Sequence, residues 1–396
     1  MLQKLLKNNE ARILFLIMDG LGGLPGPGGL TELEAARTPH LDALARDGVC
    51  GLHQPVSPGV TPGSGPAHLA LFGYDPLTYQ VGRGVLSALG IGFDLRDGDV
   101  AARGNFCTID EQGRVTDRRA GRIPTEKGGE LCRQLSRIEV PGVQLFVRPV
   151  KEYRFLLVLR GTGLSADIED TDPQRTGVSP RDPQAQDRAS RDTAGLVAQF
   201  LDRAREVLGD HHPANMVLLR GFSQRPDWPL FPERFGLDAA AVAAYPMYRG
   251  VASLVGMKVL SCGATFDQEL ETLEEQWTHH DYFFLHFKKT DSAGEDGDFE
   301  RKVAEIESVD QRLPRMLALN PDVVVVTGDH STPAALKAHS WHPVPVLLWS
   351  RYCRPDKVHA FGERGCMAGG LGPRMPTTHL MPLALANALK LEKFGA

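Results

Sequence analysis

The sequence lacks the patterns that would place it in a membrane, in a disulfide scaffold or on a nucleic acid. Its apolar run near the start extends only from Ile13 to Met18, far short of the roughly 20 apolar residues that cross a bilayer. This stretch also lacks a small-residue cleavage site, so we expect no secretory signal.

The six cysteines are scattered without a C-x-x-C pair, which argues against disulfides and thiolate zinc sites. A net charge of -5 and the absence of a Lys/Arg block give no support for nucleic-acid binding. We therefore expect a cytoplasmic protein.

The chain of 396 residues is long enough for two or three domains, since one domain usually takes about 100–200 residues. Short apolar runs at 13–18 and 323–326 are rich in branched residues and predict buried parallel strands. Further candidate strands at 216–220, 282–287 and 344–349 alternate with helical patterns. The predicted fold is therefore α/β, with a mainly parallel sheet flanked by helices.

Residues 99–211 have a different pattern, with short alternating segments, turn signals and one polar loop at 170–188. We predict that they form a smaller α+β domain inserted into the larger one. The larger domain then comprises residues 1–98 and 212–396. The polar loop is either flexible and substrate-covering or a linker.

Acidic and imidazole side chains follow three of the predicted strands. Asp19 comes after the first apolar run, Asp291 after YFFLHF, and Asp329 and His330 after VVVV. In open α/β sheets ligands bind at the carboxyl ends of strands, so these side chains are expected to converge. Each residue alone is also explained as a helix cap or turn residue. Together they indicate a site for a divalent metal, because carboxylates and imidazole suit Mn, Zn, Co or Mg.

Ser64 lies in the segment TPGSGPAH at 61–68, flanked by small or rigid residues. A helix is expected to begin at Ala67, and the amino end of a helix favours an anion. Ser64 is then either the cap of this helix or a nucleophile. A serine hydroxyl is a poor nucleophile unless a base or a metal activates it, and the predicted metal site would supply that activation.

The chain resembles the archaeal-type cofactor-independent phosphoglycerate mutases of the alkaline phosphatase superfamily. The resemblance extends over nearly the whole chain, with the motifs in the family's order. The matching blocks are MDGLGG at 18–23, TPGSGPAHLALFGYDP at 61–76, GRGVLSALGIG at 82–92, GDVAARGNFCTID at 98–110, DRRAGRI at 117–123, DTDP at 170–173, HFKKTDSAGEDGDF at 286–299, VTGDHSTP at 326–333 and HSWHPVP at 339–345.

The resemblance implies two divalent metal ions, with manganese expected and magnesium, zinc or cobalt as alternatives, and no bisphosphoglycerate. It implies that Ser64 becomes phosphorylated. The implied ligands are Asp19, Ser64, Asp329 and His330 for one ion, and Asp291 and His339 for the other. Glu295 stands where many relatives have a histidine. A glutamate oxygen also binds hard and borderline divalent metals, so we predict Glu295 as a ligand of the second ion, favouring Mn or Mg over Zn.

Basic residues supply candidates for binding the substrate, because guanidinium groups match carboxylate and phosphate and phosphoglycerate carries both. The candidates are Arg103, Arg118, Arg119, Arg122, Arg154, Arg249 and Lys289, with Lys288 as a further possible phosphate contact. A solvated basic turn is the alternative for such a cluster. The match at DRRAGRI favours substrate binding for the arginines within it.

The expected activity is the interconversion of 3-phosphoglycerate and 2-phosphoglycerate through phosphoserine, with the inserted domain closing as a lid that excludes water. A metal-dependent phosphatase, or another phosphotransferase of the superfamily, is the alternative that Glu295 keeps open. A non-catalytic binding protein would have lost metal ligands, whereas the expected positions all carry competent donors. The sequence predicts no oligomeric state.

Overall fold

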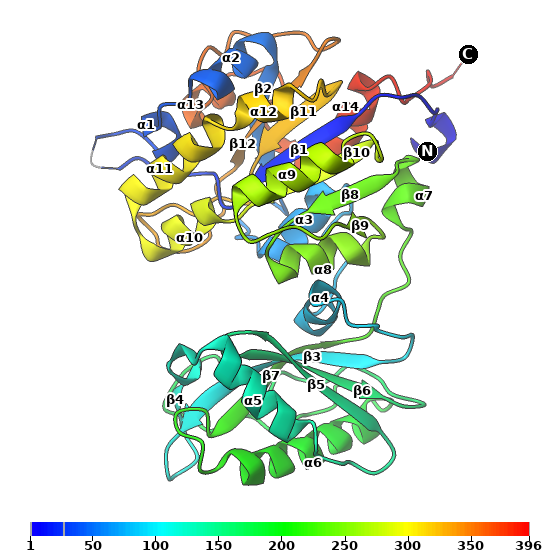
Figure 1. The fold of residues 1–396 in the computed structure, drawn as a ribbon, viewed down its shortest axis with the longest axis vertical. Helices are drawn as coiled ribbons and strands as arrows, with labels where there is room; N and C mark the ends of the chain where they lie inside the picture. The colour runs from blue at the N-terminus through cyan, green and yellow to red at the C-terminus, as the bar shows by residue number, and fades with distance from the viewer. Residues whose placement is uncertain (1, 27, 396) are drawn as a thin grey trace. The chain divides into compact units, whose positions relative to one another are not determined.

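Two structural units divide the chain, residues 1–80 with 228–396 and residues 81–227. The computed structural model describes residues 2–26 and 28–395 of them (Figure 1). The predicted inserted segment, 99–211, falls within the second unit. That unit also takes in helix α4 (Arg83–Gly90) and strand β7 (Met216–Ser223), which flank the predicted segment on either side.

The first unit is built on an eight-stranded sheet. Its central strands β11, β1, β10 and β8 run parallel, while β12 runs antiparallel to both of its neighbours, β11 and β2. The predicted mixed α/β fold with a mainly parallel sheet is confirmed. In spatial order the strands are β13 (Gly372–Pro376), β2 (Val49–Gln54), β12 (Val344–Ser350), β11 (Val323–Thr327), β1 (Ile13–Met18), β10 (Tyr282–Phe287), β8 (Ala239–Val242) and β9 (Lys258–Val259).

Helices cover both faces of this sheet, which explains why its central strands β1, β10 and β11 are buried along their whole length. Phe283 and Leu285 of β10 belong to a core cluster with side chains of α2, α9, α11 and α12. The alternate residue Phe284 contacts His68 and Phe72 from the other face, at α3. The helices are α2 (Pro39–Asp47), α9 (Phe266–Gln276), α11 (Phe299–Asp310), α12 (Leu313–Leu317), α3 (Ser64–Leu71), α8 (Pro246–Leu254) and α14 (Leu380–Asn387).

The second unit is an antiparallel sheet with a core of its own. Strand β3 (Val100–Ile109) lies between β6 (Arg154–Arg160) and β7, and β5 (Gln144–Lys151) and β4 (Val115–Asp117) extend the sheet. Helices α5 (Thr125–Leu135) and α6 (Arg191–Leu208) contribute to the core, and α4 packs against β3 and β7. Within residues 2–26 and 28–395, no helix combines the length and apolar character that a membrane span requires.

Glu269 of α9 gives the first unit a pH-dependent stability. Its carboxylate is 5% exposed and accepts a hydrogen bond from the backbone N–H of Ala244. Burial raises the pKa of Glu269 from 4.5 to about 7. The pKa of Glu269 is thus higher in the folded than in the unfolded chain. Its contribution to the free energy of unfolding is therefore fully present below about pH 4.5 and is lost as the pH rises through about 7.

We expect Glu269→Gln to remove this loss, since glutamine keeps a carbonyl oxygen for Ala244 but carries no charge. Relative to the wild type, the variant should gain roughly 3 kcal/mol between pH 4.5 and 8, as an upper value. Urea unfolding across this pH range measures the difference. Glu275→Gln, at an exposed position on the same helix, is the matched control. An identical pH profile for wild type and Glu269→Gln would contradict the assignment.

Candidate active site

Three buried side chains at the carboxyl ends of β1 and β11 form one group of potential metal ligands. Asp19, Asp329 and His330 are each fully buried, and their ligand atoms lie within 4.8 Å of one another. The Nε2 of His330 is 3.1 Å from Oδ2 of Asp329 and 3.5 Å from Oδ1 of Asp19. Because β1 and β11 are neighbouring parallel strands, the residues that follow them meet at one edge of the sheet.

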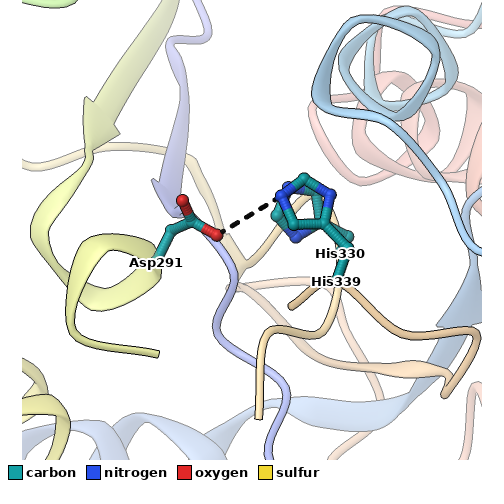
Figure 2. Close-up of side chains that lie close together, drawn as sticks. All are labelled: Asp291, His330 and His339. Carbon is teal, nitrogen blue, oxygen red and sulfur yellow. Dashed lines mark ion pairs between the residues drawn. The ribbon is translucent and has the colours of Figure 1, made fainter. Parts of the chain in front are cut away.

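A second group shares His330 and adds Asp291 and His339. Asp291 lies on α10 (Lys289–Asp296), which follows β10. Figure 2 shows Asp291 facing the two imidazoles, which stack with their centroids 3.7 Å apart. The Nε2 of His339 is 3.7 Å from Oδ1 of Asp291. The two groups therefore lie side by side, as a pair of adjacent metal ions requires.

Ser64 is the first residue of α3, with Gly63 as the N-cap. Its hydroxyl Oγ lies 3.2 Å from Nε2 of His330. The side chain therefore sits where the unpaired N–H groups of a helix start favour a phosphate. His68, one turn further along, contacts both the carbonyl of Ser64 and Oδ2 of Asp329.

Neighbouring basic side chains lower the pKa of Asp19 and of Asp329. Lys288 Nζ lies 3.0 Å from Oδ2 of Asp19 and also pairs with Asp291, and the hydroxyl of Tyr248 donates to Asp19. Burial and Asp329 act to raise the pKa of Asp19, but Lys288 and His286 outweigh them and the pKa falls below its usual value. Burial likewise opposes ionisation of Asp329, yet His330 and His68 hold its pKa well below the usual value. Metal ligands must be deprotonated, and the lowered pKa values of Asp19 and Asp329 favour the deprotonated form.

The donor set fits a divalent cation. Among the residues that the structure describes, Oδ1 of Asp19 and Oδ2 of Asp329 are buried without a hydrogen-bond partner, and a buried acceptor without a donor costs free energy. A metal ion at this position would satisfy both oxygens. Carboxylate and imidazole donors suit Mn, Mg, Zn or Co rather than a soft metal.

Three other predicted site residues of this unit do not contact the buried carboxylates. Glu295 has an exposed side chain, with Oε1 3.9 Å from Nε2 of His339. Arg249 donates to the backbone carbonyl of Leu260. Lys289 is exposed, and it is its neighbour Lys288 that reaches the carboxylates.

Four arginines gather in the second unit. Arg103 of β3 stands directly opposite Arg220 of β7 in the register of the antiparallel pair, and such like-charge pairs are destabilising. Burial, together with the charges of Arg83, Arg220 and Arg154, lowers the pKa of Arg103 to about 9. In residues 2–26 and 28–395, the buried Nε of Arg103 finds no hydrogen-bond partner. The cluster has the charge and the donors that carboxylates and phosphates require, because guanidinium groups bind such anions.

The remaining predicted arginines are arranged differently. Arg118 forms a two-bond pair with Asp172, at 2.9 and 2.7 Å. Arg119 and Arg122 are exposed. Asp172 also lies 3.5 Å from Arg220, so Arg118 contacts the arginine cluster only through a shared carboxylate.

Comparison with known proteins decides the family. A family model described as 2,3-bisphosphoglycerate-independent phosphoglycerate mutase matches residues 45–215. A protein of Thermus thermophilus named as a probable enzyme of this kind is 52% identical over 100% of this chain and 98% of its own. A counterpart from Aquifex aeolicus is 49% identical over 100% of this chain and 99% of its own. The chain belongs to the 2,3-bisphosphoglycerate-independent phosphoglycerate mutases. It is accordingly an isomerase, an intramolecular phosphotransferase.

Solved structures of similar chains agree with this membership. The PH0037 protein of Pyrococcus horikoshii has a TM-score of 0.85 and 31% identity, covering 98% of this chain and 100% of its own. A cofactor-independent phosphoglycerate mutase from Thermoplasma acidophilum has a TM-score of 0.72 and 31% identity, covering 96% and 100%. The family predicted from the motif blocks is confirmed.

Several site residues were not predicted from the sequence. Tyr248 and His286, which contact Asp19, lie in segments of otherwise ordinary strand and helix pattern; a histidine inside the apolar run YFFLHF was the available signal. Arg83 lies in the motif block GRGVLSALGIG at 82–92 but was not singled out there, and Arg220 carries no local signal beyond charge. Antiparallel pairing and the packing of α4 bring them to Arg103.

Proposed function

We propose that the chain interconverts 3-phosphoglycerate and 2-phosphoglycerate without bisphosphoglycerate, through a phosphoserine at Ser64. The position of Ser64 carries this proposal, because its hydroxyl meets His330, the residue shared by both groups of potential ligands. A cytoplasmic location fits a glycolytic reaction of this kind and remains a prediction.

Two divalent ions are expected at the site. Asp19, Asp329, His330 and Ser64 would hold one, and Asp291, His339 and Glu295 the other. When bound, such ions lower the pKa of a hydroxyl and neutralise charge on phosphoryl oxygens. Manganese is the expected metal, since oxygen donors in both groups favour a harder cation than zinc.

The reaction consists of two displacements at phosphorus. In the first, a bond forms between Ser64 Oγ and phosphorus, the bond from phosphorus to the 3-oxygen breaks, and that oxygen takes up the proton that Ser64 released. In the second, a bond forms between the 2-oxygen of glycerate and phosphorus, the bond from phosphorus to Ser64 Oγ breaks, and Oγ takes up the proton that the 2-hydroxyl released. The start of α3 supplies N–H groups to phosphoryl oxygens, and we expect Lys288 to donate to one of them.

The arginine cluster of the second unit is proposed to bind the carboxylate of the substrate. Four guanidinium groups accumulate there, with Asp170, Asp172 and Glu152 as the nearby acids, and the Nε of Arg103 has no hydrogen-bond partner among the described residues. A carboxylate would relieve the repulsion between Arg103 and Arg220. It would also retain glycerate, as isomerisation without release requires.

Replacing Arg103 by methionine should raise KM for 3-phosphoglycerate by about 10–100-fold, because a hydrogen bond to a charged group is lost. The carboxylate does not change charge during transfer, so kcat should change less. The fraction of turnovers ending in free phosphate should rise, since glycerate leaves more easily. Arg203→Met, at an exposed position on α6, is the control. An unchanged KM would remove Arg103 from the substrate site.

The decisive assay couples 2-phosphoglycerate formation to enolase, with Mn²⁺, without bisphosphoglycerate, and with free phosphate measured in parallel. Formation of 2-phosphoglycerate with little phosphate release supports the proposal. Phosphate release without isomer would instead establish the alternative, a metal-dependent phosphatase or another phosphotransferase. The exposed Glu295 at a position where many relatives carry histidine is the feature that favours this alternative.

A further inference from the structure

A completely buried lysine lies behind the candidate metal site. Lys302 of α11 has no exposed surface, and its Nζ donates to two backbone carbonyls, of Gly22 at 3.0 Å and of Thr332 at 2.9 Å. The facing acid is Glu32, with Oε1 3.9 Å from Nζ. Burying an ammonium group is costly even when it is hydrogen-bonded, so the position of Lys302 calls for a reason beyond packing.

The two carbonyls belong to the two loops that carry the first group of ligands. Gly22 follows Asp19 after β1, and Thr332 follows Asp329 and His330 after β11. The carbonyl of Gly22 also accepts the backbone N–H of Thr332, at 3.0 Å. The ammonium group of Lys302 therefore joins the two loops.

Thr332 extends this connection to the second group of ligands. Its hydroxyl donates to Oδ1 of Asp291 at 2.7 Å and lies 3.0 Å from Nδ1 of His330. Glu32 adds a further tie, since its Oε1 accepts the backbone N–H of Ala334 at 2.7 Å. A single ammonium group is thus linked, through one residue, to ligands that come from β10 and β11.

We propose that Lys302 is a positioning residue of the metal centre, which fixes the loops after β1 and β11 in the geometry that binds two divalent ions. The inference rests on the proposed metal-dependent function. Partners that orient the ligands of a metal ion commonly change its affinity by about 10–100-fold when they are removed. Lys302 hydrogen-bonds to no ligand side chain among the described residues. It instead holds the backbone of the loops from which the ligands project.

A second buried lysine of the same unit provides a matched control. Lys390 is 2% exposed, and its Nζ also pairs with a backbone carbonyl and a carboxylate, those of Asn9 and Asp281. Asp281 directly precedes β10, so Lys390 lies at the opposite end of that strand from Asp291. Loss of either lysine removes a buried charge, but only Lys302 is connected to the ligands.

The test measures Mn²⁺ binding directly, from the electron paramagnetic resonance signal of free Mn²⁺, without phosphoglycerate. We expect Lys302→Met to raise the Kd for Mn²⁺ by about 10–100-fold and Lys390→Met to leave it within twofold of the wild type. Thermal unfolding of the metal-free proteins separates a general loss of stability from this effect. Since Lys302→Met leaves Glu32 without its cation, the double variant with Glu32→Gln is measured in parallel and judged by the same criterion if the single variant does not fold.

The outcomes distinguish a failure of the positioning role of Lys302 from a failure of the proposed metal-dependent function. If the wild type binds Mn²⁺ and the Lys302 variants bind it equally well, the positioning role is wrong, whatever their stability, while the proposed function stands. If the wild type binds no Mn²⁺, the metal-dependent function is overturned and the positioning role with it. Weaker binding confined to the Lys302 variants supports the proposal.

Discussion

Ser64→Ala is expected to lower the mutase rate by a factor on the order of 10⁴–10⁶, the range seen when a nucleophilic serine is removed from an enzyme. The variant keeps the start of α3 and all carboxylate and imidazole ligands, so it should still fold and bind substrate. What it loses is the oxygen that we propose carries the phosphoryl group between the two displacements. The measurement is the enolase-coupled rate in the presence of Mn²⁺.

A second readout makes this experiment specific. With substrate labelled on phosphorus, the wild type should retain label on Ser64 after rapid acid quenching, and the variant should retain none. Ser57→Ala is the matched control, because Ser57 lies in the preceding loop and contacts Gln54 through its backbone carbonyl. Substantial mutase activity in a metal-replete Ser64→Ala protein would show that the phosphoryl group travels by another route.

Removal of divalent metal is expected to have an effect of similar size, with activity falling to background after exhaustive chelation. Oδ1 of Asp19 and Oδ2 of Asp329 find no hydrogen-bond partner in the described part of the chain, and chelation removes the cation that would lower the pKa of the Ser64 hydroxyl. Added Mn²⁺ should restore the rate more fully than Zn²⁺, since Glu295 adds a second carboxylate beside Asp291. Full activity in protein shown by elemental analysis to be metal-free would contradict the two-metal proposal.

The preference between metals can be tested at one residue. Glu295→His exchanges an oxygen donor for a nitrogen donor, and we expect the Zn²⁺-supported rate to rise relative to the Mn²⁺-supported rate. Glu300→His, at an exposed position on α11, introduces the same side chain away from the ligands. An unchanged ratio of the two rates would place Glu295 outside the metal centre.

The convergence of Asp19, Asp291, Asp329 and His330 was predictable because parallel strands impose a simple rule, while their role as metal ligands stays a prediction. β1, β10 and β11 are apolar runs that end in polar residues, and adjacent parallel strands deliver those residues to one edge. His339 was assigned through the family motif, since its place beside Asp291 depends on the path of the loop between β11 and β12. Asp19, Asp291, Asp329 and His330 thus needed only local patterns.

The arginine cluster and Lys302 were not predictable by the same reasoning. The contact between Arg103 and Arg220 arises from the register of two strands far apart in the chain, and no local periodicity encodes a register. Arg118 lies in the motif block DRRAGRI, for which the resemblance predicts substrate binding. Its Nε and Nη2 nevertheless both donate to the carboxylate of Asp172. Lys302 belongs to a charged helix segment, and only the packing of α11 against the sheet shows that it is buried.

The reversal of direction at β12 has a consequence for how this enzyme can change over evolutionary time. Because β12 runs antiparallel to β11, the segment between them leaves and re-enters the sheet at the same edge, and it carries His330 at one end and His339 near the other. An insertion or deletion in this segment would shift the spacing between ligands of both groups at once. Variation in length should therefore be tolerated in other surface loops while this one keeps a fixed number of residues.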